Sequence, residues 1–288
     1  MPSEIIQWFP GHMAKTRRLI SENLKNVDLV IELLDARIPY SSKNPEIKRI
    51  VGDKPTLTLL NKASLADPAA NARWAKYYSG KLSRCVVTDC ASGDGMKEVA
   101  SSVKELMSEK LQRYSDKGMD GRRLRAMIVG IPNVGKSSLI NRLSSSKKAK
   151  VENRPGVTLN KQWIQTGIGI DLLDMPGVLW PKFDERTVGE NLAITGAIKD
   201  DILDAETVAI ALCSRLRALY PELLCARYKI DGAAKLEGLE DYEVFELVGK
   251  KRGCIVSGGE IDHERTAKLL LEEFRSAKIG RITLENPK

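Results

Sequence analysis

The stretch "RAMIVGIPNVGKSSLINRL", Arg125 to Leu143, decides the fold, because an apolar run, a glycine-rich turn and a helical pattern follow one another in it. Its centre, Gly130 to Ser138, contains the pattern G-x-x-x-x-G-K-S/T. In such a loop the backbone N–H groups lie at a helix N-terminus and bind phosphate oxygens. A tight glycine turn without any ligand is the alternative, and the strand-then-helix setting makes it the weaker interpretation.

The same loop predicts how individual residues hold a nucleotide. Its backbone amides form a nest for the phosphates, Lys136 bridges the β- and γ-phosphates, and the Ser137 hydroxyl binds Mg²⁺. The expected nucleotide-binding residues of the loop are Asn133, Val134, Gly135, Lys136, Ser137 and Ser138.

Two short motifs downstream of this loop extend the expected site. The motif "PGVT" ends in Thr158, which offers a second hydroxyl to Mg²⁺. The motif "DLLDMPG" places Asp174 at a strand end, where it can hold the metal through water, and its last residue, Gly177, offers an amide to the γ-phosphate. In this order the motifs predict a nucleotide triphosphatase switch, with Lys136, Thr158 and Gly177 acting in catalysis.

Apolar, β-branched runs alternate with helical or turn-rich segments along the first part of the chain. This alternation predicts an α/β fold, a mostly parallel sheet with helices on both faces. A further strand pair is expected at 162–168 and 169–175, and a helix at 96–114. The apolar runs lie at 28–36, 55–60, 85–91 and 125–131.

Two upstream segments have the composition of a purine pocket. The segment "NKAS" (Asn61 to Ser64) ends one apolar run, and "TDCASGDG" (Thr88 to Gly95) ends another. If both strands run parallel to the phosphate-loop strand, all three loops emerge at the same sheet edge, where ligands bind in open α/β folds. An accident of composition is the alternative. The expected purine contacts are Asn61, Lys62, Ser64, Cys90 and Ala91.

Longer motifs cover nearly the whole chain: "WFPGHMAK", "DARIPYSSKNP", "GIPNVGKSSLINRL", "DMPGVLWPK" and "HERTAKLLLEEFRSAKIGRI". With them the sequence resembles the circularly permuted GTPases of the YlqF/RbgA type, which assist assembly of the large ribosomal subunit. In that family the guanine-reading motifs precede the P-loop. Permutation is tolerated where the ends of a domain are close together and exposed. The resemblance implies a P-loop NTPase fold, GTP hydrolysis stimulated by the ribosomal particle, GTP/GDP and Mg²⁺ as ligands, and a large-subunit precursor with its rRNA as partner.

The expected domain organisation combines this resemblance with the helical periodicity of the last part of the chain. There, Val208, Leu212, Leu216 and Leu219 fall on one helix face. The expected parts are an N-terminal segment (1–25) packing on the GTPase domain, the permuted GTPase domain (26–180), a linker (181–203) and a small helical C-terminal domain that binds RNA (204–288).

The sequence departs from the family pattern at Ser64, where the family has an aspartate. A carboxylate would accept hydrogen bonds from both N1–H and the exocyclic amine of guanine, whereas the serine hydroxyl accepts one. By analogy with bidentate base contacts, the loss amounts to ~1–3 kcal/mol of discrimination. We therefore expect GTP to be preferred over ATP by a reduced margin.

The usual water-orienting glutamine after D-x-x-G is replaced by Val178 and Leu179, which cannot orient a water. The resemblance implies that His12 is brought to the γ-phosphate instead; a structural histidine is the alternative. It also implies that Asn133 binds K⁺, as in potassium-stimulated relatives, unless this asparagine only shapes the loop.

The charge distribution indicates a polyanionic partner. The net charge is +8, and residues 1–180 hold 29 Lys and Arg against 18 Asp and Glu, whereas residues 181–288 hold 17 against 20. Within 122–161 there are ten basic residues and one acid, more than a triphosphate needs, which favours nucleic acid. Lys15, Arg17 and Arg18 add to this basic character.

Other features narrow the class of protein. No apolar run is long enough for a bilayer and no secretory signal begins the sequence, so a cytoplasmic protein without a membrane partner is expected. The five cysteines suggest neither a disulfide framework nor a zinc site. A P-loop ATPase or kinase, favoured by Ser64, and a non-catalytic nucleotide-gated RNA-binding module, favoured by the missing glutamine, remain alternatives. The oligomeric state is open, and a monomer is assumed.

Overall fold

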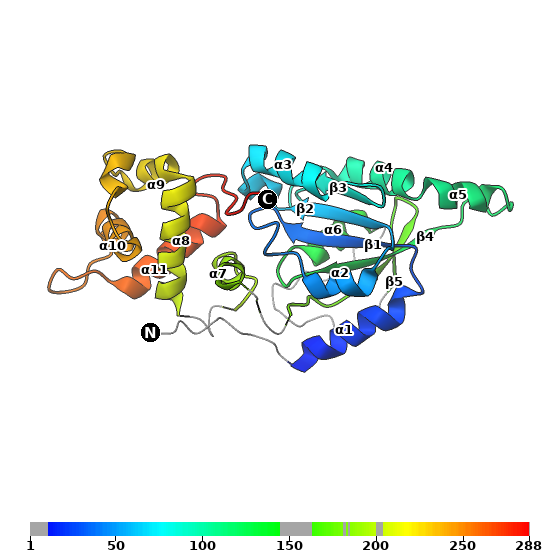
Figure 1. Cartoon of the computed structure of the whole chain (residues 1–288), viewed down its shortest axis with the longest axis horizontal. Helices are drawn as coiled ribbons and strands as arrows, with labels where there is room; N and C mark the ends of the chain where they lie inside the picture. The colour runs from blue at the N-terminus through cyan, green and yellow to red at the C-terminus, as the bar shows by residue number, and fades with distance from the viewer. Residues whose placement is uncertain (1–10, 145–162, 181–182, 184, 200–203, 288) are drawn as a thin grey trace.

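The computed structural model describes residues 11–144, 163–180, 183, 185–199 and 204–287. An α/β half and a helical half lie side by side, with one helix between them (Figure 1). The strands are β1 (Leu29–Asp35), β2 (Thr56–Asn61), β3 (Ser83–Val87), β4 (Leu124–Gly130), β5 (Trp163–Gln165) and β6 (Ile170–Asp174). The α-helices are α1 (Gly11–Leu24), α2 (Pro45–Val51), α3 (Pro68–Tyr78), α4 (Met96–Leu106), α5 (Ser108–Ser115), α6 (Lys136–Leu143), α7 (Arg186–Ile194), α8 (Ala205–Leu219), α9 (Pro221–Tyr228), α10 (Asp241–Lys251) and α11 (His263–Arg275), with short 3₁₀ turns η1 (Ala63–Leu65) and η3 (Ala233–Leu236).

The sheet has the order β3-β2-β1-β4-β6-β5, and every neighbouring pair is parallel except β5 with β6. The predicted mostly parallel sheet is therefore confirmed. Its register pairs Asp35 with Asn61 and Ile128 with Asp174, so the carboxyl ends of the strands lie along one edge. The loops that follow β1, β2, β4 and β6 start from this edge.

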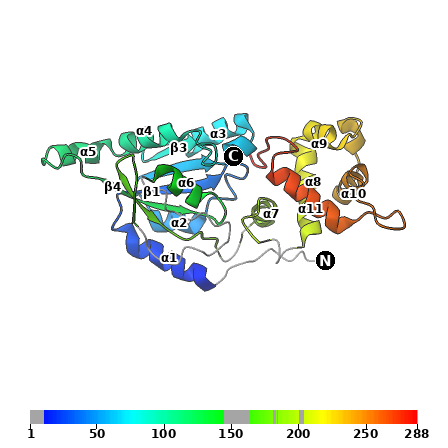
Figure 2. The ribbon, with the colours of Figure 1, turned by 180° about the vertical axis from the view of Figure 1, so that it is seen from behind.

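The apolar runs become strands because both faces of the sheet are covered. Every residue of β1 is buried, as expected for a central strand of a parallel sheet. Figures 1 and 2, which view the molecule from opposite sides, show α2 in front of the sheet in one view and α6 in front in the other. The expected helix at 96–114 is divided at Met107 into α4 and α5, and α5 has no buried residue.

The helical half is built around α8. Val208, Leu212 and Leu216 of α8 are fully buried and pack in one core with α10 and α11. Leu219, predicted on the same face, is the last residue of the helix and is 39% exposed. None of the described helices is both long and apolar enough to cross a bilayer, and the five cysteines are free thiols.

The interval expected as a linker, 181–203, contains α7. Its residues from Val188 to Ile194 are buried, and they join the same hydrophobic core as the sheet and α8. Figure 1 shows α7 between the two halves. Within the described part of this interval, α7 is therefore packed between the two halves, where its buried apolar side chains cover surface that both halves would otherwise expose.

After α11 the chain returns to the α/β half along residues 281–286, here called the strap. Backbone bonds join Ile282 N–H to Leu65 C=O (3.1 Å) and Leu284 N–H to Arg37 C=O (2.8 Å). The Glu285 carboxylate accepts the Tyr40 N–H at 2.7 Å. The strap thus fixes the helical half to the loops that follow β1 and β2.

A buried carboxylate organises the interior of the helical half. Glu273 of α11 is 5% exposed and accepts hydrogen bonds from Arg227 (2.6 and 2.9 Å), from the Tyr228 hydroxyl (2.9 Å) and from Arg252. Burial alone would raise the pKa of this carboxyl, but the two guanidinium groups and the hydroxyl lower it to about 2.

We expect Glu273→Gln to lower the free energy of unfolding by about 3–5 kcal/mol, because two arginines then lose their buried counter-charge. Chemical denaturation of the variant at pH 7 measures this loss. Glu272→Gln, one residue earlier on the exposed face of α11, is the matched control and should change stability little.

The same carboxylate predicts a pH dependence. Since its pKa is lowered in the folded state, its contribution is present above the ordinary glutamate value of 4.5 and is lost as pH falls toward 2. The stability difference between wild type and Glu273→Gln should therefore shrink below about pH 4.5. A difference that stays constant down to pH 3 would contradict this account.

Candidate functional site

One asparagine side chain joins three loops at the carboxyl edge of the sheet. The Asn61 Nδ2 group, at the end of β2, donates to Val134 C=O in the loop after β4 (2.8 Å). Its Oδ1 accepts the N–H of Cys90 in the loop after β3 (2.9 Å). Asn61 is 3% exposed, so both bonds are shielded from water. Segments separated by 73 and 29 residues are thereby held against one another.

This contact explains one glycine of the phosphate loop. Gly135 has φ +105°, and a Cβ built on it would lie 2.3 Å from the Asn61 amide nitrogen. Any other residue would push Asn61 away as well as strain the backbone. The G-x-x-x-x-G-K-S/T pattern and the N-K pair are therefore parts of one packing arrangement.

The phosphate loop ends in the first turn of α6, where Lys136, Ser137 and Ser138 are each half-buried. The Lys136 ammonium donates to the C=O groups of Ile131 (2.9 Å) and Gly130 (3.3 Å). Burial lowers the pKa of this ammonium to about 8, although the Asp174 carboxylate opposes the shift. Its charge is held inside the loop, where a phosphate would lie.

The loop after β6 is docked on the phosphate loop. The Val178 N–H donates to Gly130 C=O (3.2 Å), and a Cβ on Gly177 would meet Lys136 Nζ and Pro132 Cα at 2.9 Å. Burial raises the pKa of Asp174, with Lys136 and the Met175 amide opposing the shift. Few groups therefore offset the cost of burying the Asp174 charge, and a cation held through a water molecule would stabilise it. The Ser137 hydroxyl, Asp174 and phosphate oxygens would form the oxygen-rich ligand set that Mg²⁺ prefers.

A buried ion cluster binds the N-K segment, Asn61 and Lys62, to the end of β1. Asp35, at the end of β1, accepts bonds from Arg37 (2.7 and 2.9 Å) and from the Lys62 ammonium (2.9 Å). Burial alone would raise the pKa of Asp35, but the two cations bring it well below its usual range. Burial also lowers the pKa of Lys62, which has a left-handed φ of 63°. Asp35 and Arg37 belong to the "DARIP" motif, and a charged pair at the end of a mostly apolar strand is the signal that could have identified them.

Two of the expected purine contacts, Ser64 and Ala91, bond to Asp89, a residue that sequence reasoning missed. The Ser64 N–H donates to Asp89 Oδ2 (3.2 Å), and the Ser64 hydroxyl bonds to the same oxygen. The Ala91 N–H, expected to face a guanine carbonyl, donates to Asp89 Oδ1 at 2.9 Å. Arg142 of α6 donates to the C=O groups of Cys90 and Ala91 and holds this loop on the P-loop helix.

Asn133 connects the phosphate loop to the segment after α7. It has φ 57°, and its Nδ2 group donates to Gly196 C=O at 2.9 Å. Its amide nitrogen is therefore used in a contact between distant segments, while its carbonyl oxygen is the atom that a K⁺ ion would need.

The side chains of two expected catalytic residues, His12 and Thr158, lie outside the described residues. His12 lies in the first turn of α1, but its side chain is outside the described part of the structure, and Thr158 is outside it entirely. Within the described residues, no cluster of three or more His, Cys, Asp or Glu side chains could hold a metal ion.

Several of the basic residues expected at an RNA surface have protein partners. Arg17 pairs with Glu46 (2.9 Å), and Arg123 pairs with Asp171 (2.6 Å). The Arg125 guanidinium lies over the exposed Trp163 ring, 5.3 Å from its centroid. Arginine stacked on an exposed aromatic ring retains its charge and can still face a phosphate.

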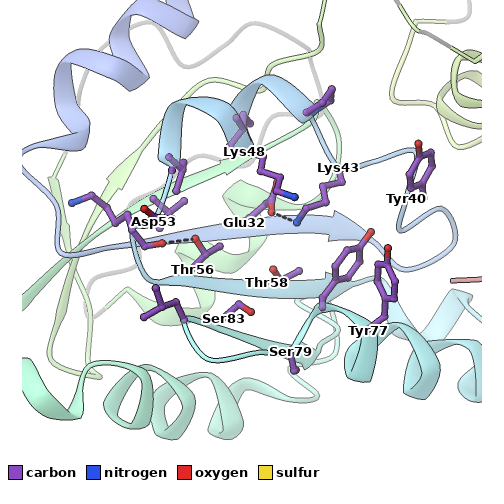
Figure 3. A pocket seen from close by; sticks show the side chains of 18 of the residues that line it. Glu32, Tyr40, Lys43, Lys48, Asp53, Thr56, Thr58, Tyr77, Ser79 and Ser83 are labelled. Carbon is purple, nitrogen blue, oxygen red and sulfur yellow. Dashed lines mark hydrogen bonds and ion pairs between the residues drawn. The ribbon is translucent and has the colours of Figure 1, made fainter. Parts of the chain in front are cut away.

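A separate cavity of about 640 Å³ lies on a face of the sheet, and the loops after β1 and β6 contribute Tyr40 and Trp180 to its lining. Figure 3 shows it over β1 and β2, with Glu32 and Lys43 paired inside and Tyr40 and Tyr77 at one end. Its lining has three lysines and three acids, Lys43, Lys48, Lys54, Glu32, Asp53 and Glu185. The charges balance, so the cavity has no net charge that would attract a phosphate.

The lowered pKa of Lys136 predicts proton uptake when a nucleotide binds. With a pKa of about 8, the ammonium is largely neutral at pH 8.5, and a phosphate would restore its charge. We expect GDP binding to take up about three quarters of a proton at pH 8.5 and about a tenth at pH 7. Calorimetry in two buffers of different ionisation enthalpy measures this. The same heat in both buffers at pH 8.5 would contradict it.

Comparison with known proteins agrees with this architecture. Residues 125–215 match the family model described as 50S ribosome-binding GTPase. A protein named Ribosome biogenesis GTPase A from Priestia megaterium is 51% identical over 284 residues, covering 98% of this chain and 97% of that protein. One of the same name from Bacillus cereus is 48% identical, with 98% and 94% covered. A solved structure described as GDP-bound TM YlqF superposes with a TM-score of 0.63 at 25% identity, covering 94% of this chain and 99% of that chain. This chain therefore belongs to the ribosome biogenesis GTPase A family.

Proposed function

We propose that this chain binds GTP at the carboxyl edge of its parallel sheet and hydrolyses it in the course of assembling the large ribosomal subunit in the cytoplasm. GTPase activity follows from its family. The observation that supports this location of the site is the double hydrogen bond of Asn61. It holds the two purine loops against the phosphate loop although they precede it in the sequence.

In the proposed complex the phosphate-loop amides surround the β- and γ-phosphates, and the Lys136 ammonium turns from its loop carbonyls to the phosphate oxygens. Ser137 and Thr158 hydroxyls, with Asp174 through water, would hold Mg²⁺, which neutralises charge that develops during phosphoryl transfer. Gly177 packs against the Lys136 ammonium, since a Cβ built on it would lie 2.9 Å from Lys136 Nζ, and its amide would contact the same phosphate.

We propose that the nucleotide state reaches the helical half through α7. The loop after β6 rests on the phosphate loop and leads along the chain to α7. At the other end of α7, Asn133 binds Gly196 C=O, and Arg275 of α11 donates to the C=O groups of Ala193 and Ile194 (2.9 Å each). A movement of the phosphate loop would therefore change the contacts that α7 and the segment after it make with the helical half.

Contact with the ribosomal precursor is assigned to exposed basic side chains on both halves. In the helical half Lys250, Lys251 and Lys278 are exposed, whereas Arg252 is bound to Glu273 and Arg281 to the loop after β2. In the α/β half Lys15 is exposed on α1. These cations suit rRNA phosphates.

Two catalytic roles rest on the resemblance to the family. We propose that His12 is brought to the γ-phosphate and that Asn133 Oδ1 binds K⁺. We expect His12→Ala to bind GDP normally and to lose most GTP turnover, measured by phosphate release. Unchanged turnover would reject the histidine, and equal rates in KCl and NaCl would reject the potassium site.

Hydrolysis with and without purified large ribosomal subunits tests the proposed function. We expect GTP turnover to be slow for the protein alone and to rise about tenfold or more with large subunits, because a partner completes the site. Small subunits are the matched particle control, and Lys136→Ala is the inactive control. ATP turnover above GTP turnover would support a P-loop ATPase, and GTP binding without hydrolysis under every condition would support a nucleotide-gated binding module.

A further inference from the structure

A carboxylate lies against position 64 although residue 64 is a serine. It belongs to Asp89, in the loop after β3, and its Oδ2 atom is bonded to both the N–H and the hydroxyl of Ser64. Ser64 and Ala91 are exposed, whereas Asp89 is 4% exposed between them. The three residues form a group in which the two base-facing positions flank one acidic side chain.

The position of Asp89 is fixed by its own loop. Its Oδ1 accepts the N–H groups of Ala91 (2.9 Å) and Ser92 (3.2 Å), and its backbone C=O accepts the Gly93 N–H (2.7 Å). Arg142 holds the same loop from the P-loop helix. Burial raises the pKa of Asp89, but the hydrogen bonds from Ser64, Ser92 and Ala91 outweigh it, so the carboxyl is ionised at neutral pH.

We propose that Asp89 is the residue that selects guanine over adenine. Its carboxylate is held against Ser64 and takes the place of the carboxylate that residue 64 does not provide. This inference rests on the proposed GTP site and deepens it. In the empty site the carboxylate accepts the Ser64 hydroxyl and the Ala91 amide. When guanine binds, its N1–H and 2-amino groups replace these donors, and the released Ala91 N–H turns to the guanine carbonyl oxygen.

Guanine can replace the protein donors of the Asp89 carboxylate, whereas adenine cannot, because the two bases present different numbers of hydrogen-bond donors. Guanine presents two donors to the carboxylate and one acceptor to the amide. Adenine presents a bare ring nitrogen at N1 and no donor at C2, so the carboxylate would face a lone pair. Because Asp89 is buried, an unsatisfied contact there is costly. The discrimination expected from an aspartate at position 64 is supplied from the neighbouring loop.

The first test needs no variant. Inosine diphosphate differs from GDP only by lacking the 2-amino donor. If a carboxylate accepts that donor, the wild-type protein should bind GDP roughly tenfold more tightly than inosine diphosphate by titration calorimetry, and ADP more weakly still. Equal affinity for GDP and inosine diphosphate would overturn the role of Asp89. A wild type that binds no GDP would instead overturn the proposed function.

The second test exchanges the carboxylate for an amide. Asp89→Asn should lose about tenfold or more in GDP affinity and should gain affinity for xanthosine diphosphate, since the asparagine amine donates to the C2 carbonyl of xanthine. Glu98→Gln, which changes an exposed acid in the first turn of α4, is the matched control and should behave as wild type. The double variant Ser64→Asp, Asp89→Asn returns the carboxylate to position 64 and should prefer GDP again. The inference is wrong if Asp89→Asn keeps the wild-type order of GDP over xanthosine diphosphate.

Discussion

The structure depends on one amide that hydrogen-bonds in two directions. Asn61 donates to the phosphate loop and accepts from the loop after β3, and it does so in a buried position. A buried hydrogen bond adds only about 1 kcal/mol net, but leaving either partner unpaired costs about 1–3 kcal/mol. A misalignment of the three loops would therefore cost free energy at both hydrogen bonds of Asn61. Such closure does not depend on the order of the loops in the sequence, and for this reason a permuted chain can build the same site as an unpermuted one.

Permutation also changes what the GTPase fold is joined to. In this chain the segment after β6 continues into α7, and the segment after α11 returns as the strap, so the helical half is attached to the α/β half at two places. A single hydrophobic core runs from the sheet through α7 to α8 and α11. Arg37 contacts both halves. It pairs with Asp35 at the end of β1, and its guanidinium lies over the Phe274 ring of α11, 5.5 Å from the ring centroid. Domains joined in this way move together rather than independently.

The sequence was most informative where a feature repeats or has a fixed spacing. Apolar runs predicted the parallel sheet because burial on both faces demands them, and the P-loop pattern located the loop between β4 and α6. It was least informative where a residue acts through a distant partner. In the sequence Asp89 is an ordinary loop acid, and only the fold shows that it contacts Ser64. Likewise, Arg281 reads as a surface cation, but in the structure it donates to the C=O groups of Ala63 and Ala66. The helix α7 was missed because it is short and buried nearly all round, and its sequence mixes apolar residues with Arg186, Glu190 and Asn191.

The strap has a consequence for how the protein is made. Arg281 donates to Ala66 C=O (3.0 Å) and Ala63 C=O (2.9 Å), so the strap supports the turn that carries Ser64, and the Thr283 hydroxyl donates to Ala36 C=O (3.0 Å) in the loop after β1. These residues are translated more than two hundred positions after that turn. A nascent chain can form its sheet and phosphate loop while synthesis continues, because domains fold progressively from the N-terminal side. Its purine-binding turn gains this support only after the strap has emerged, so the turn lacks these hydrogen bonds while the residues between it and the strap are being translated.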